Sequence, residues 1–187
     1  MLEYIIEKDK AFLLYLNGLG SEQWDDFWLF ISHKLSALPL YLLLLFFCFK
    51  CFKWKKTLLI LLCVVLMIVS TDQLANLFKY GFERLRPCHD DSLISQMRLV
   101  ICGGKYGYFS AHAASSMAAA VFFGGLFRKK IKWLLPVLLS WSFLVGYSRI
   151  YLGVHFPGDV LTGFIIGGFL GLIFYKILVY FFTKYKY

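Results

Sequence analysis

The chain has 187 residues, of which 60% are hydrophobic, 20% aromatic and only 17% charged, and its mean hydropathy is +0.68. Because soluble domains carry about a quarter charged residues, this composition excludes an ordinary soluble protein and predicts a single membrane domain over residues 1–187. The net charge of +9 includes short lysine-rich clusters beside apolar blocks, which are typical of cytoplasmic loops and argue against nucleic-acid binding.

Residues 1–34 differ from the rest of the chain because their apolar runs are short and interrupted. The first twenty residues contain five charged side chains and no adequate apolar stretch, so we expect no cleavable signal peptide. A break at 17–20 separates two segments, and Ser21 is a suitable N-cap for the second, which is rich in aromatic residues. We expect two amphipathic helices in the membrane interface; in the alternative, the second segment extends the first membrane span.

Five long apolar blocks follow, and each approaches the roughly 20 residues that a helix needs to cross about 30 Å of hydrocarbon. The expected spans are 35–51, 57–78, 110–127, 133–149 and 158–180. The sequence therefore predicts an all-α fold, an integral membrane bundle of about five transmembrane helices preceded by the interfacial segment.

Basic clusters at 50–56 and 128–132, together with Lys184 and Lys186 at the end of the chain, contain no acidic residue. By the positive-inside rule all three lie in the cytoplasm, and alternation places the N-terminus, residues 79–109 and the turn near 150–157 outside. The loop over 79–109 is too long for a simple connector, which marks it as functional. We therefore expect a multi-pass protein of the inner (cytoplasmic) membrane whose site faces the periplasm or exterior.

Two of the five cysteines, Cys88 and Cys102, lie in this outer loop and could form a disulfide that closes it in an oxidising compartment. The other three fall within or beside apolar spans, and the Cys-x-x-Cys at 48–51 has no further ligands near it. We therefore assign no metal to this pair.

Ionisable and hydroxyl residues gather where the spans meet the outer surface, although the topology rests on lysines elsewhere. They are Lys79, Arg86, Ser110, His112, Ser148, Arg149, His155 and Asp159. For any single one a snorkelling anchor or a structural histidine is the common explanation, but their joint occurrence at one face favours a catalytic site.

The cations of this group suit a phosphate ester, whose nearly two negative charges require positioning and charge stabilisation. We assign phosphate binding to Lys79, Arg86 and Arg149. Ser110 adds a hydroxyl, and the amides near Ala111 open a helix whose dipole favours an anion.

The two histidines and the carboxylate supply groups for the chemistry. A neutral His155 can attack phosphorus, and Asp159, four residues later, can accept its other ring N–H. His112 can protonate the leaving oxygen and later activate water. Asp159 shares an i, i+4 stripe with three glycines of the last span, so we expect it to face protein and not lipid.

Residues near this group receive supporting roles. Asp72 lies seven residues before Lys79 on the same helix face, and we expect it to support that lysine, with direct catalysis as the alternative. Ser148, beside Arg149, belongs to the same supporting set. The remaining charged residues of the outer loop, Arg84 among them, are expected to form a solvated surface or to select the head group, and His33 is expected to be structural.

The pattern resembles the signatures of the type 2 phosphatidic acid phosphatase superfamily. Residues 79–87 match Lys-x6-Arg-Pro, and residues 148–159 match Ser-Arg-x5-His-x3-Asp. Residues 109–112 keep the serine and histidine of Pro-Ser-Gly-His, but Phe and Ala replace its proline and glycine. The resemblance implies a helical bundle that hydrolyses lipid phosphates without a metal or other cofactor, with His155 as nucleophile, His112 as acid and base, and Asp159 orienting His155.

The substrate stays open among undecaprenyl diphosphate, phosphatidate, phosphatidylglycerophosphate and lipid A, and a short chain with an outward-facing site suits the polyprenyl carrier best. Two other functions share these residues: a phosphotransferase that passes phosphate to a lipid acceptor, and a non-catalytic phospholipid-binding or transport protein. The two histidines argue against the second, because binding alone needs only the cations. The oligomeric state is not readable from the sequence.

Overall fold

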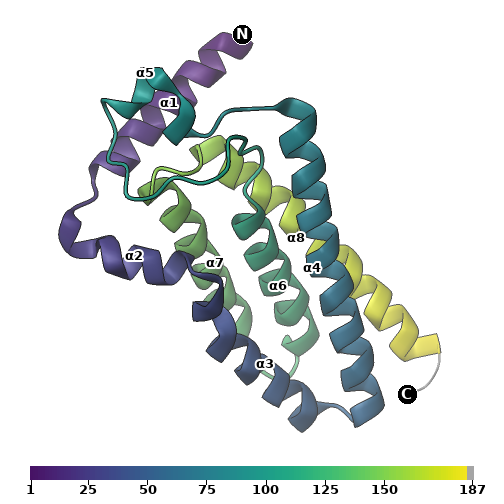
Figure 1. The fold of residues 1–187 in the computed structure, drawn as a ribbon. Helices are drawn as coiled ribbons and strands as arrows, with labels where there is room; N and C mark the ends of the chain where they lie inside the picture. The colour runs from purple at the N-terminus through teal and green to yellow at the C-terminus, as the bar shows by residue number, and fades with distance from the viewer. Residues whose placement is uncertain (185–187) are drawn as a thin grey trace.

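The computed structural model describes residues 1–184, and within them the chain is helical apart from turns and loops (Figure 1). The long helices are α3 (Leu38–Cys51), α4 (Trp54–Phe82), α6 (Ala111–Phe127), α7 (Leu134–Tyr151) and α8 (Pro157–Lys184). In the described part of the chain, extended pairing is limited to an isolated bridge between Leu85 and Tyr106. The predicted all-α fold is therefore confirmed.

The outer faces of the long helices are apolar. α3 with the short turn before it, α4, α7 and α8 are long and apolar enough to cross a membrane, and α6 is a shorter apolar helix of 17 residues. Large side chains on these faces are exposed, for example Leu62 at 54% and Phe169 at 65%. Helix faces covered with exposed apolar side chains are unfavourable in water and favourable against lipid. The protein is therefore embedded in the membrane, and each expected span falls on one of these helices.

α6 forms the centre of the bundle, where it packs against both α7 and α8. Its alanines leave room for three glycines of α8. A Cβ atom at Gly163 would lie 2.6 Å from the carbonyl oxygen of Ser110, and one at Gly171 would lie 2.5 Å from that of Ala118. Only glycine permits so close an approach. The glycine stripe thus packs inside one bundle and turns the start of α8, with Asp159, toward α6.

The N-terminal region forms α1 (Leu2–Gly18), the 3₁₀ turn η1 (Glu22–Trp24) and α2 (Asp25–Ser32). Ser21 occupies the N-cap position of η1, but its side chain makes no capping hydrogen bond. The extended residue His33 and the 3₁₀ turn η2 (Lys34–Ala37) separate α2 from α3, so the second segment does not extend the first span. Figure 1 shows α2 running across the long helices, as an interfacial helix would, with α1 at the same end of the bundle.

The outer loop begins later than predicted. The boundary at residue 79 was wrong, because α4 continues to Phe82 and the carbonyl oxygen of Lys79 still accepts a hydrogen bond from Glu83, whose φ of 47° turns the chain. The loop contains η3 (Pro87–His89) and α5 (Asp91–Ile94). The connections after α3 and α6 and the end of α8, which carry the basic clusters, lie at the opposite end of the bundle (Figure 1). Lys186 lies outside the described residues.

Candidate active site

A cavity of about 580 Å³ lies between α3, α4, α6 and α7 at the end of the bundle that carries the long loop. Several residues assigned to the site from the sequence line it: Lys79, Arg86, Ala111, His112, Arg149 and His155. They come from α4, the outer loop, the start of α6, the end of α7 and the turn before α8. The fold therefore brings the separate sequence patterns to one cavity.

A tight turn between α7 and α8 places His155. The backbone N–H groups of Leu152 and Gly153 donate to carbonyl oxygens in the last turn of α7, and that of His155 donates to the carbonyl oxygen of Arg149 at 3.3 Å. Gly153 has φ of +77°, and a Cβ atom there would lie 2.5 Å from Cε of Met97. The positive φ of this turn therefore favours glycine, and the side chain of Met97 occupies the space that a Cβ atom would take.

His155 is almost fully buried, and its Nδ1 atom lies 3.4 Å from Oδ2 of Asp159. The same oxygen accepts the backbone N–H of Phe156 at 3.1 Å, which holds the carboxylate in place. Burial lowers the pKa of His155 well below 6.5, and the guanidinium groups of Arg86 and Arg149 lower it further. His155 is therefore a neutral imidazole at neutral pH, with Nδ1 beside a carboxylate and Nε2 left for chemistry.

Arg149 is buried at the cavity wall, with only 8% of the residue exposed. One of its terminal nitrogens, Nη1, donates to the hydroxyl of Ser32 from α2. Its Nε atom is buried and has no hydrogen-bond partner among the described residues. A buried guanidinium N–H without a protein acceptor calls for an explanation, and a phosphate oxygen in the cavity would satisfy it.

Arg86 is held in the loop by close contact with two glycines. Its Nε atom donates to the carbonyl oxygen of Tyr106 at 3.1 Å. A Cβ atom at Gly103 would lie 2.7 Å from Nη1 of Arg86, and one at Gly107 would lie 2.7 Å from its Cγ. The backbone thus wraps the side chain along its length and directs the guanidinium group to the cavity.

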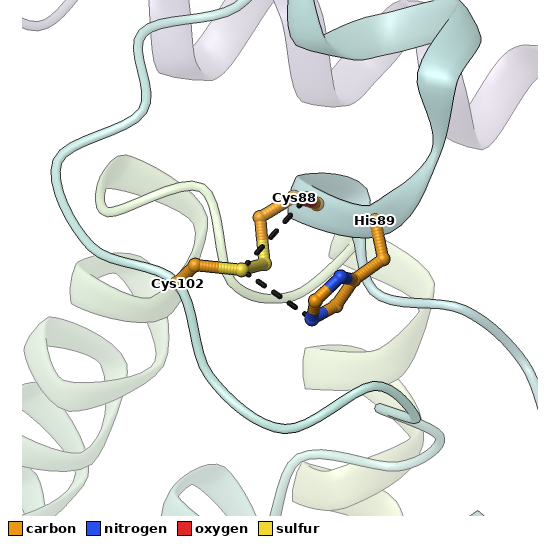
Figure 2. A group of neighbouring side chains, drawn as sticks. All are labelled: Cys88, His89 and Cys102. Carbon is orange, nitrogen blue, oxygen red and sulfur yellow. Dashed lines mark hydrogen bonds between the residues drawn. A yellow bond between two sulfur atoms is a disulfide. The ribbon is translucent and has the colours of Figure 1, made fainter.

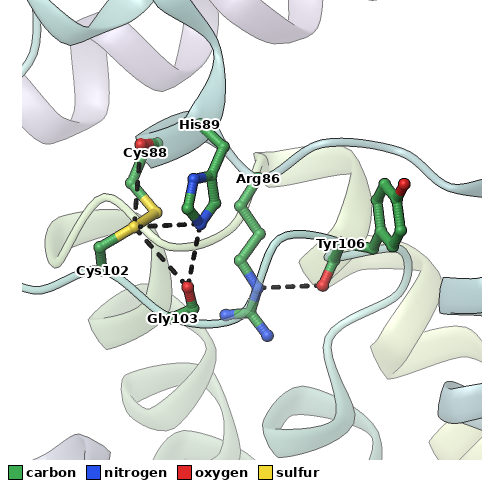
Figure 3. The surroundings of a disulfide bond; sticks show 6 residues. All are labelled: Arg86, Cys88, His89, Cys102, Gly103 and Tyr106. Carbon is green, nitrogen blue, oxygen red and sulfur yellow. Dashed lines mark hydrogen bonds between the residues drawn. A yellow bond between two sulfur atoms is a disulfide. The ribbon is translucent and has the colours of Figure 1, made fainter.

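A disulfide joins Cys88 to Cys102 and closes the part of the loop that follows Arg86. His89 lies against it, with Nε2 3.5 Å from Sγ of Cys102 (Figure 2) and 3.0 Å from the carbonyl oxygen of Gly103. The ligand atoms of the three side chains lie within 4.8 Å of one another, but both thiols are used in the disulfide and offer no thiolate to a metal. Figure 3 shows the group beside Arg86, so it fixes the loop around that side chain.

The other assigned residues are Ser110, Ser148 and Asp72, and of these only Asp72 lines the cavity. Ser110 is fully buried and caps α6 by accepting a backbone N–H of the first turn at 3.5 Å, and it does not line the cavity. Ser148 donates its hydroxyl to the carbonyl oxygen of Val145 at 2.7 Å, within its own helix. Asp72 lines the cavity, but no ion pair joins it to Lys79 within residues 1–184, because two helical turns separate them.

Arg84 does not lie on a solvated surface, and that expectation was wrong. Its Nη1 atom donates to Oδ1 of Asp159 and its Nη2 atom to Oδ2 of Asp9, both at 2.6 Å. The loop folds back between α1 and the start of α8, which no local pattern in the sequence indicates. Lys34 and Tyr41 also line the cavity, and neither stands out from its neighbours in the sequence.

Comparisons with known proteins agree with this architecture. The family model described as PAP2 superfamily matches residues 58–183. The chain is 38% identical over 181 residues to the lipid A 4'-phosphatase of Bacteroides thetaiotaomicron, a match that covers 95% of this chain and 80% of the relative. It is 29% identical over 122 residues to the undecaprenyl-diphosphatase of Sulfolobus acidocaldarius, which covers 64% of this chain and 56% of that protein.

A solved structure shows the same fold. The transmembrane phosphatidylglycerolphosphate phosphatase of Bacillus subtilis aligns with a TM-score of 0.74 at 22% identity, over 97% of this chain and 87% of the other. Because the alignment covers nearly the whole chain, it includes the N-terminal helices as well as the bundle.

Proposed function

The chain belongs to the PAP2 superfamily and is a membrane lipid phosphatase, and we propose that it removes phosphate from lipid A through a phosphohistidine on His155. The observation that carries this proposal is the buried pair of His155 and Asp159 at a cavity lined by cationic side chains. Identity of 38% over 95% of the chain to a lipid A 4'-phosphatase supports the substrate. We place the site at the extracytoplasmic face of the inner membrane, since the basic loops lie at the other end of the bundle.

The phosphate group would bind among the three cations that line the cavity. Arg149 offers a buried N–H without a protein partner, and Arg86 offers the end of its guanidinium group while Tyr106 holds its Nε. Lys79 adds a point charge from the last turn of α4. Together these groups stabilise the charge on the equatorial oxygens as the reaction proceeds.

In the first step, the lone pair on Nε2 of His155 attacks phosphorus, and the bond from phosphorus to the lipid oxygen breaks. That oxygen keeps the bonding electrons and takes a proton from His112, so the lipid leaves as an alcohol. The Asp159 carboxylate, beside Nδ1, stabilises the positive charge that develops on the ring.

In the second step, water attacks phosphorus while His112, now neutral, takes one of its protons. The bond between phosphorus and Nε2 breaks and its electrons return to the ring, which releases inorganic phosphate and restores both histidines. The residues that we assign to these steps bind the phosphate and move the protons themselves. The proposal therefore predicts full activity in EDTA.

A polar stripe on α4 favours lipid A over the polyprenyl carrier that the sequence ranked first. Asp72, Gln73 and Asn76 line the cavity within a membrane span, and none has a hydrogen-bond or ion-pair partner among the described residues. Polar side chains inside a membrane need partners, and an ionised carboxylate can only accept. Lipid A offers sugar hydroxyls and amide N–H groups as hydrogen-bond donors to these side chains, whereas a polyprenyl chain has no donor.

The deciding experiment measures phosphate release by the purified protein in EDTA from lipid A, undecaprenyl diphosphate, phosphatidate and phosphatidylglycerophosphate. We expect lipid A to be the best substrate and His155→Ala to be inactive, with Lys105→Ala, an exposed residue of the outer loop outside the cavity, as the control. Release by His155→Ala at the wild-type rate would refute the mechanism, and loss of wild-type activity in EDTA would implicate a metal. A higher kcat/KM for undecaprenyl diphosphate than for lipid A would overturn the assignment of lipid A as the substrate.

The phosphohistidine can be sought directly. With ³²P-labelled lipid A, rapid denaturation at alkaline pH should trap label on the wild-type protein and not on His155→Ala, because a phosphoramidate is stable to base and labile to acid. Labelled product on an added lipid alcohol, in place of inorganic phosphate, would make the protein a phosphotransferase. Neither label transfer nor release from any substrate would support the binding or transport function.

A further inference from the structure

We propose that Arg84 and Asp9 are positioning residues for the nucleophile, so that the N-terminal helix α1 completes the active site of the bundle. This inference rests on the proposed role of His155 in phosphate transfer. Neither residue lines the cavity, and neither belongs to the patterns that the sequence shares with the phosphatase superfamily.

A continuous chain of contacts runs from α1 to the nucleophile. Asp9 accepts Nη2 of Arg84 at 2.6 Å, Arg84 donates Nη1 to Asp159 at 2.6 Å, and Asp159 lies 3.4 Å from Nδ1 of His155. The second oxygen of Asp9 accepts the backbone N–H of Gly158 at 2.8 Å. α1 therefore holds both the side chain and the backbone of the segment that presents His155.

The stacking of Arg84 leaves its guanidinium group little freedom. Its central carbon lies 4.2 Å from the centroid of the Phe156 ring, within the range of a cation–π interaction. Phe156 is the residue directly after the nucleophile, and its backbone N–H donates to Asp159. Arg84 thus touches both residues that fix the orientation of His155.

Burial makes this arrangement electrostatically important. The side chain of Asp159 is fully buried, whereas those of Arg84 and Asp9 are 25% and 13% exposed. A buried carboxylate requires a compensating charge, and neutral His155 does not provide one. Arg84 supplies that charge, so Asp159 can remain ionised while the imidazole beside it stays neutral and nucleophilic.

Without Arg84, the uncompensated carboxylate would attract a proton to the neighbouring ring. The groups that face His155 are Arg86 from the loop, Lys79 from α4, Arg149 from α7, Asp159 from α8 and, as a second titratable group, His112 from α6. Loss of Arg84 would remove one further positive charge from the surroundings of Asp159 and His155. The surroundings would then favour the protonated ring, which raises the pKa of His155. A merely structural contact would not have this effect.

A second ion pair of α1 supplies a matched control. Lys10 pairs with Asp90 at 2.8 Å, with side chains 24% and 21% exposed, and so joins the same helix to the same loop. This pair has no contact with Asp159 or His155. If α1 served only to hold the loop in place, loss of either ion pair would lower kcat to the same extent.

The test compares Arg84→Gln and Asp9→Asn with Lys10→Ala, measuring kcat, KM and the pH profile of kcat/KM on lipid A in detergent micelles. We expect Arg84→Gln to lower kcat on the order of 10- to 100-fold with little change in KM, and to move the acid limb to higher pH. Asp9→Asn should lower kcat less, Arg84→Lys should restore part of the loss, and Lys10→Ala should behave as wild type. The effects of Arg84→Gln and Asp9→Asn should be less than multiplicative in the double variant, because they break one chain of contacts.

Wild-type kcat and acid limb in a folded Arg84→Gln protein would overturn the inference, as would a rise in KM alone, which would make Arg84 a substrate-binding residue. An equal loss of kcat in Lys10→Ala would also overturn it, since α1 would then only hold the loop in place. His155→Ala separates the two claims. If that variant is inactive while Arg84→Gln is normal, only the positioning role fails; if His155→Ala remains active, the proposed mechanism fails.

Discussion

Arg149 is the residue whose surroundings indicate an anion most directly. It is buried at the cavity wall, and its Nε atom has no partner among the described residues. An unpaired buried donor costs about 1–3 kcal/mol, which a bound phosphate oxygen would recover. The hydrogen bond from its Nη1 atom to the hydroxyl of Ser32 holds the plane of the guanidinium group. The site that we propose for phosphate therefore has one of its cations held in place by the protein itself.

The pKa of His155 leads to a prediction for the pH dependence of activity. Burial and then the charge of Arg86 depress this pKa well below 6.5, so the neutral imidazole persists as pH falls through 6.5. We expect Arg86→Gln to retain weak activity and to move the acid limb of kcat/KM to higher pH, because removing a positive charge favours protonation of the ring. Comparing both proteins on one substrate cancels the titration of the substrate phosphate.

The control for this experiment is Lys105→Gln, which removes an exposed cation of the same loop from a position outside the cavity. Its acid limb should coincide with that of the wild type. An acid limb in Arg86→Gln at or below the wild-type pH would contradict the electrostatic effect assigned to Arg86.

For individual residues, the sequence predicts contacts between side chains one helical turn apart. It does not predict contacts between residues that only the tertiary fold brings together. His155 and Asp159 are four residues apart, so spacing alone predicted their contact. Ser110 was expected on phosphate, but capping of α6 turns its hydroxyl inward. Arg84 lies 75 residues from both of its partners, and only the path of the outer loop brings them together.

Among the elements, the end of α1 is joined to the end of α7 by Asn17. Its side-chain amide donates to the carbonyl oxygens of Tyr151 at 2.8 Å and Arg98 at 3.0 Å, and its oxygen accepts the N–H of Arg98 at 2.7 Å. We expect Asn17→Ala to lower the free energy of unfolding by roughly 3 kcal/mol, because several buried groups lose partners at about 1 kcal/mol each. The thermal midpoint in detergent measures this loss.

Asn76→Ala is the matched control, since Asn76 has no hydrogen-bond partner among residues 1–184. Its stability should stay within about 0.5 kcal/mol of the wild type. Equal midpoints for Asn17→Ala and Asn76→Ala would mean that Asn17 does not hold α1 to the bundle.

The outer loop owes part of its order to the disulfide, whose cysteines are 14 residues apart. Cross-links that close loops of this length stabilise a fold by about 3 kcal/mol. We expect the double variant Cys88→Ser with Cys102→Ser to unfold at a lower temperature and to have a higher KM, because Arg86 lies on the loop. A reductant should lower the midpoint of the wild type and leave that of the variant unchanged, and sensitivity of both to reductant would implicate another bond.

The membrane spans were predictable because hydropathy depends on composition over some twenty residues and not on tertiary contacts. The two N-terminal helices were also predicted, from the break at 17–20, but their positions on the bundle were not, because specific contacts determine them. α2 is held by an ion pair of Asp25 with Arg98 at 2.9 Å and by a hydrogen bond from Tyr151 at 2.7 Å. Each of these partners lies more than 70 residues away, beyond the range of a local pattern.

Across the whole molecule, the basic clusters of the connecting segments and the cavity lie at opposite ends of the bundle (Figure 1). The basic connections follow α3 and α6, whereas the outer loop, the turn before α8 and α2 contribute residues to the cavity. A lipid phosphate in the outer leaflet would reach the cavity without crossing the membrane, and phosphate would be released outside. This orientation is a prediction of the positive-inside rule.

Single cysteines at the two ends test that orientation in intact spheroplasts. Lys105 and Lys129 are both exposed, the first in the outer loop and the second after α6. A membrane-impermeant maleimide should label Lys105→Cys before lysis and Lys129→Cys only after it. The native protein gives the background to be subtracted: Cys88 and Cys102 are bonded to each other and Cys48 and Cys63 are buried, but the partly exposed Cys51 lies at the same end as Lys129 and should react after lysis. The reverse pattern would place the cavity in the cytoplasm, and the substrate would then have to be a lipid phosphate of the inner leaflet.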